Sequence, residues 1–88
     1  MRSIVIDEQR NWIYSAGEDD RTLLVFDLEK GLILGSLKIT NATITCMTCD
    51  YYLKRLYCAT REGMLLFFDI NDVTPLLVHS MRMVRPES

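Results

Sequence analysis

The pattern of apolar and polar positions divides the chain into short apolar segments separated by polar turns. We predict strands at residues 3–7, 12–17, 22–28, 32–39, 43–49, 56–60, 64–70 and 76–81, because these segments are rich in β-branched and aromatic residues and are separated by turns that contain Gly, Asp, Asn or Pro. No helical periodicity is sustained anywhere. Segment 22–28 is apolar at nearly every position, so we expect both of its faces to be covered and this strand to be the most buried of its sheet.

The second half of the chain repeats the first. Asp7 and Tyr14 recur 43 residues later as Asp50 and Tyr57, whereas Phe26 recurs 42 residues later as Phe68. One residue is therefore missing from the second turn, which is where a sheet tolerates a change of length, since a slip inside a strand would exchange its two faces. A repeat of this period with four short strands per unit is typical of propeller blades.

The repeated segments resemble the WD40 repeat family. The resemblance is carried by residues 14–17, 19–22 and 23–27 in the first unit and by 57–60, 62–64 and 65–69 in the second. It implies that Phe26-Asp27 and Phe68-Asp69 replace the Trp-Asp dipeptide of the family. The Gly-His dipeptide that opens a typical repeat is absent from both units, and residues 39–42 take its place in the second.

The resemblance also implies positions for the buried hydrogen-bond tetrad of the family. Its Ser or Thr falls at Ser15 and Cys58, and its turn Asp falls at Asp19 or Asp20 and at Glu62. The predicted fold class is all-β and antiparallel, with two four-stranded β-propeller blades that form a partial WD40-like propeller. We assign residues 1–40 to the first blade, 41–82 to the second and 83–88 to a tail.

Two blades cannot close a propeller ring, which typically holds four to eight. We therefore expect this chain to be part of a larger propeller, a truncated product of one, or a subunit that assembles with further copies. The 88 residues allow at most one small domain, whose core is marginal.

Composition narrows the class of function. The net charge is −2 with both signs interspersed, which argues against a nucleic-acid partner, and no apolar run is long enough for a membrane span. The apolar stretch near Met1 is too short for a signal peptide. Three cysteines indicate a reduced, intracellular setting, and we expect a cytoplasmic protein.

The residues that could carry chemistry have simpler interpretations. Cys46 and Cys49 have the spacing of half a zinc site, with Cys58 and His79 as further ligands, but residues three apart in a strand point to opposite faces. We interpret these cysteines as small buried apolar residues. The acidic residues 18–20 lack the alternating ligand positions of a calcium loop and are interpreted as a hairpin turn.

Asp27 and Asp69 recur at the same place in each unit, so we expect them to accept hydrogen bonds from loop amides rather than to act in catalysis. His79 has no nucleophile at motif spacing. We expect no enzymatic activity, no metal and no cofactor.

The predicted function is that of a non-catalytic WD40-like scaffold that mediates protein–protein interaction. The partners would be other proteins or the remaining blades of a propeller. The predicted contact surface comprises the charged and polar residues of the turns, namely Asp19, Asp20, Arg21, Lys38, Thr40, Asn41, Arg61 and Glu62. Two alternatives are a purely structural segment that completes a propeller without its own binding site, and a small self-contained β-sandwich binding module.

Overall fold

The computed structural model describes residues 2–17, 21–39 and 42–84 and contains eight strands within them. They are β1 (Arg2–Asp7), β2 (Trp12–Gly17), β3 (Thr22–Asp27), β4 (Ile33–Lys38), β5 (Ile44–Asp50), β6 (Arg55–Thr60), β7 (Met64–Asp69) and β8 (Leu76–Arg82). None of the described residues is helical. Every strand begins and ends within one residue of its predicted segment, because Asp and Gly mark many of the points where the chain turns.

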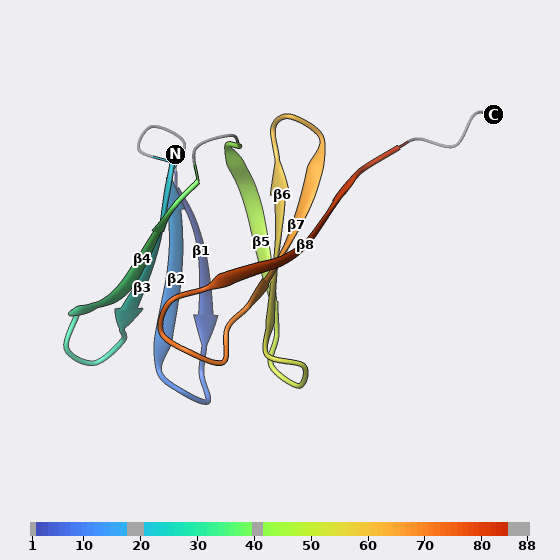
Figure 1. The fold of residues 1–88 in the computed structure, drawn as a ribbon. Coiled ribbons are helices and arrows are strands. Elements are labelled where there is room, and N and C mark those ends of the chain that lie inside the picture. The colour runs from blue at the N-terminus through green and yellow to red at the C-terminus, as the bar shows by residue number, and fades with distance from the viewer. Residues whose placement is uncertain (1, 18–20, 40–41, 85–88) are drawn as a thin grey trace.

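The strands form two antiparallel four-stranded sheets, with the orders β1-β2-β3-β4 and β5-β6-β7-β8 (Figure 1). The all-β, antiparallel prediction with two four-stranded sheets is therefore confirmed. Each sheet is a meander in which every strand pairs with the next along the chain. The sheets lie side by side, with β1 of the first sheet against β5 of the second (Figure 1).

The repeat extends to the geometry of the turns. Asn11 and Lys54, at equivalent places after β1 and β5, both have positive φ values of 56° and 55°. The oxygen Oδ1 of Asp7 accepts hydrogen bonds from the amides of Gln9 and Arg10, at 3.1 and 3.3 Å. A carboxylate placed at the start of a turn satisfies amides that no strand pairs, and the repeated Asp therefore fixes the turn.

The same arrangement confirms the role predicted for the repeated Asp residues. Asp27 Oδ1 accepts from the amides of Glu29 and Lys30, at 2.9 and 3.0 Å. Asp69 Oδ1 accepts from the amide of Asn71 at 2.9 Å, and this bond is the main reason that the pKa of Asp69 lies below its usual range. These carboxylates are occupied by their own loops.

Gly35 in β4 lets the two sheets approach each other closely. A Cβ atom at this position would lie 2.3 Å from the carbonyl oxygen of Val73, in the β7–β8 loop of the other sheet. The register of β3 against β4 also shifts between Val25 and Phe26, directly beside this glycine. A glycine inside a strand often marks a bulge or a close approach of another backbone, and both features are present at Gly35.

Each sheet has two faces, and the repeat shows which face of the first sheet is equivalent to which face of the second. We call "front" the face with Tyr14, Ala16, Leu23 and Val25 in the first sheet and Tyr57, Ala59, Leu65 and Phe67 in the second. We call "back" the face with Ile13, Ser15, Leu24 and Phe26 in the first sheet and Leu56, Cys58, Leu66 and Phe68 in the second. The core is formed by the front face of the first sheet and the back face of the second.

The prediction that the strand at 22–28 is the most buried of its sheet is wrong. Leu23 and Val25 of β3 are fully buried, but Leu24 and Phe26, on the back face, are only half-buried. β2 has four buried residues in succession and is the more buried strand. The sequence predicts that both faces of β3 are buried, whereas the structure buries only the face with Leu23 and Val25.

Candidate functional site

The predicted contact residues that the structure describes lie at one end of the two sheets. Lys38 ends β4, and the amide of Ile39 next to it donates to the carbonyl oxygen of Arg21 at 2.8 Å. Arg61 and Glu62 form the turn between β6 and β7. We call Arg21, Lys38, Arg61 and Glu62 the turn cluster. The other predicted contact residues, Asp19, Asp20, Thr40 and Asn41, lie outside the described residues.

Thr43 ties the second sheet's turn to the segment that connects the two sheets. Its amide donates to Oε1 of Glu62 at 2.9 Å, and its carbonyl oxygen accepts from the amide of Arg61 at 2.8 Å. Thr43 is buried, whereas the turn beside it is exposed. The sequence predicts Thr43 only as the first residue of the strand at 43–49, and its apolar neighbours give no signal of this role. The backbone of the turn cluster is thus held in place while its charged side chains remain at the surface.

The charges of the turn cluster act on one another. The hydrogen bond from the Thr43 amide holds the pKa of Glu62 below its usual range, and the positive charge of Arg21 contributes in the same direction. Arg21 and Glu62 come from different sheets, so this part of the surface is shared by both repeats. A surface with both signs of charge at fixed positions favours a partner with the complementary pattern.

We expect the hydrogen bond to Glu62 to make stability depend on pH. A carboxylate whose pKa is lower in the folded than in the unfolded state stabilises the fold above its unfolded pKa, about 4.3 for Glu, and this contribution is lost as the pH falls through the folded value. The Glu62→Gln variant should therefore lose less free energy of unfolding than the wild type as the pH falls. Unfolding by denaturant between pH 3 and 7 checks the expectation, and identical pH profiles for the two proteins would contradict it.

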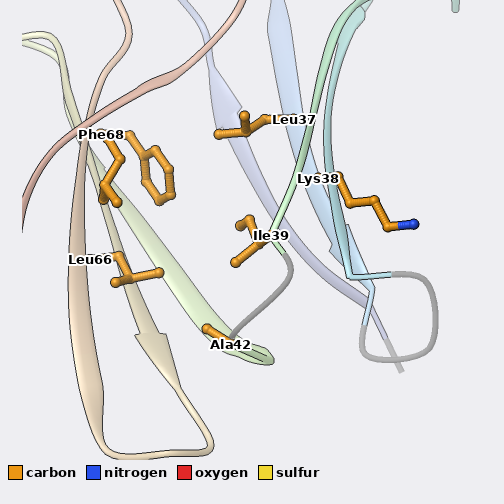
Figure 2. Close-up of a pocket in the computed structure, with 7 residues that line it drawn as sticks. Leu37, Lys38, Ile39, Ala42, Leu66 and Phe68 are labelled. Atoms are coloured by element: carbon orange, nitrogen blue, oxygen red, sulfur yellow. The ribbon is translucent and has the colours of Figure 1, made fainter.

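A groove of about 260 Å³ opens between the sheets next to the turn cluster. Figure 2 shows its lining, with Leu37 and Ile39 on one side and Leu66 and Phe68 on the other, while the amino group of Lys38 points away from it. Ala42 and Leu77 complete the lining. The groove is apolar and has a basic residue beside it, a composition that suits an apolar group.

A network around Arg10 joins the two sheets at the opposite end. Nε of Arg10 pairs with Oδ2 of Asp7 at 2.8 Å, Nη2 donates to the hydroxyl of Tyr14 at 3.0 Å, and Nη1 donates to the carbonyl oxygen of Ile70 in the second sheet at 2.6 Å. The guanidinium also lies 4.0 Å from the centre of the Trp12 ring. Burial raises the pKa of Tyr14, so its hydroxyl stays protonated and can accept this bond. The network is structural, and it was not predicted.

The cysteines and His79 do not converge. Cys46 is exposed, Cys49 is half-buried and Cys58 is buried, and all three are free. The interpretation as buried apolar residues is correct for Cys58, whose burial raises the pKa of its thiol to about 12, and wrong for Cys46. No group of three metal-ligating side chains occurs among the described residues. His79 instead lies edge-on against Phe67, with ring centroids 5.1 Å apart.

No helix in the described part of the chain is long and apolar enough to cross a membrane. No protein-family model matches the chain. The chain is similar to the CCR4-associated factor 4 homolog of Vanderwaltozyma polyspora, with 33% identity over 64 residues. The match covers 73% of this chain and 10% of that protein, so the chain spans about a tenth of the length of this curated relative.

Proposed function

We propose that the two sheets are consecutive WD40-like propeller blades and that the chain is a non-catalytic scaffold segment that binds other proteins. Three observations support the blade assignment. The repeat has a period of 42 or 43 residues, each unit is one four-stranded antiparallel meander, and the Asp-capped turns recur at equivalent places. Units of this kind stack because none can bury its apolar faces alone.

The observation that carries the proposal is the way in which the sheets stack. The front face of one unit packs on the back face of the next, so the same repeat position is buried in one sheet and partly exposed in the other. Phe68 is 2% exposed, whereas its equivalent Phe26 is only half-buried. A contact between unlike faces can be repeated at both ends of the stack, which is how successive blades build a propeller.

The turn cluster supplies the binding surface in this proposal. Its backbone is held by the bonds to Thr43 and Arg21, and the carboxylate of Glu62 is held by the Thr43 amide, so this charge keeps its position in the absence of a partner. Preorganised charges reduce the cost of binding and favour specific partners. The relative from Vanderwaltozyma polyspora is named as a factor associated with CCR4, and an associating role is the kind of function that we propose here.

Photo-crosslinking tests the binding function. A photoreactive residue at position 61 in the turn cluster should capture a protein that the same residue at position 30, in the loop at the other end of the sheet, does not capture. The reversal Glu62→Lys should weaken this capture about tenfold or more, since a cation of the partner that faced the carboxylate would then face a like charge, which costs at least about 1.4 kcal/mol. The matched reversal Lys30→Glu should leave it unchanged.

The alternative of a purely structural blade has one observation in its favour. Glu62 and the Arg61 amide already serve the connection between the sheets through Thr43. If position 61 captures no more protein than position 30, the turn cluster has only this structural role.

A further inference from the structure

We infer that a second copy of this chain docks head-to-tail, with the front face of the second sheet of one copy on the back face of the first sheet of the next. This inference rests on the proposed function, because it uses the stacking of the two blades. It follows from the contact between the two sheets inside the chain, because each free face is the repeat equivalent of a face that this contact buries.

The free back face of the first sheet is apolar and open. Ile4, Ile6 and Ile33 on this face are 61%, 43% and 60% exposed, and Leu24 and Phe26 between them are half-buried. The equivalents of Leu24 and Phe26 in the second sheet are Leu66 and Phe68, which belong to the core. An apolar surface of this extent is typical of an interaction site.

The free front face of the second sheet has the matching composition. Tyr57 and Phe67 pack edge-on with ring centroids 5.2 Å apart, and Leu65 lies beside them. All three are half-buried, whereas the equivalents of Tyr57 and Leu65 in the first sheet, Tyr14 and Leu23, are fully buried. The face that covers Tyr14 and Leu23 inside the chain is a back face, which makes the back face of another copy the matching occupant.

One difference in side-chain size between the two front faces has a counterpart in the loops. His79 pairs with Phe67 at the position where Gly35 pairs with Val25, so the second sheet has an imidazole where the first has no side chain. Gly35 is needed because the β7–β8 loop, residues 70–75, comes close to it. At the junction between copies, His79 would face the β3–β4 loop, residues 28–32, which is one residue shorter. The shorter loop leaves room for the larger side chain.

Two blocked variants test the junction. Ile6→Glu places a charge on the free back face, and Leu65→Glu places one on the free front face. Light scattering should show that the wild-type chain has a mass above its monomer mass of 10.2 kDa and that each variant alone is monomeric. An equimolar mixture should form a 1:1 heterodimer, because each variant retains the face that the other has lost, with affinity at least ~10-fold above that of either variant for itself.

A second measurement applies if circular dichroism shows that either charged variant is unfolded. Inside the chain, Tyr14 belongs to the core between the sheets and Cys49 packs against the same core. The equivalent residues at the junction are Tyr57 and Ile6. Mixed Ile6→Cys and Tyr57→Cys chains should therefore form a disulfide between the two substituted positions, and neither variant alone should dimerise through its new cysteine.

Three results would overturn the inference. They are a folded wild-type monomer at all concentrations, self-association of a single blocked variant through like faces, and folded variants that remain monomeric when mixed. Failure of the proposed binding function is measured separately, by the crosslinking at position 61. If that crosslinking succeeds and the mixture remains monomeric, the blades still bind proteins and only the docking of a second copy is wrong.

Discussion

Replacement of Phe68 by alanine is expected to lower the free energy of unfolding by about 3–5 kcal/mol, as measured by denaturant unfolding of the chain at a concentration where it is monomeric. Phe68 is 2% exposed and lies on the back face of the second sheet, inside the contact between the sheets. Its removal enlarges the groove that Phe68 and Leu66 line, and the paired strands on both sides limit how far the structure can collapse into the space.

Phe26 provides a matched control for this substitution. It occupies the same repeat position and has the same chemistry, but its face is uncovered, so Phe26→Ala should cost only about 1–2 kcal/mol in the monomer. If a second copy covers the back face, the difference between the losses caused by Phe68→Ala and Phe26→Ala should become smaller as the protein concentration rises. Association stabilises the folded state by mass action, and Phe26 would then be buried as well. Equal losses at low concentration would contradict the assignment of Phe68 to the core and of Phe26 to a free face.

The local structure could be predicted from the sequence because local chemistry determines it. The turns follow Asp7, Asp27, Asp50 and Asp69. Their carboxylates accept hydrogen bonds from backbone amides two or three residues later, so each turn is specified within a few residues. Gly31 has a φ of 70°, as expected for the glycine of a hairpin loop. The alternation between the faces then follows from the strand period, which is why two four-stranded sheets could be expected from the sequence.

The features that could not be predicted depend on how the two sheets are placed relative to each other. The apolar pattern of β3 shows that Leu24 and Phe26 need cover but not whether this chain supplies it. The bond from Thr43 to Glu62 joins residues 19 positions apart, through a connecting segment whose path has no sequence signature. Arg10 and Ile70 are 60 positions apart, and a carbonyl oxygen as acceptor leaves no trace in residue type.

Replacement of Arg10 by methionine is expected to lower the free energy of unfolding by about 3–5 kcal/mol, because it removes the partner of a buried charge. Asp7 is 1% exposed, and its Oδ2 pairs with Nε of Arg10 at 2.8 Å. The Ile70 carbonyl and the Tyr14 hydroxyl lose their hydrogen bonds to the guanidinium at the same time. Arg10→Lys should recover only part of the loss, because an ammonium group cannot reach all three partners with the geometry of a guanidinium.

Two further variants separate this network from a general effect of lost charge. Lys54→Met removes a cation whose Nζ lies 3.4 Å from Oε1 of Gln9 in an exposed contact between the same two sheets, and it should change stability by less than about 0.5 kcal/mol. The double variant Asp7→Asn/Arg10→Met should lose less free energy of unfolding than the two single variants lose in sum, because the buried charge that Arg10 neutralised is then absent. An additive double variant, or a loss below about 1 kcal/mol for Arg10→Met, would show that the sheets are held together by apolar contact alone.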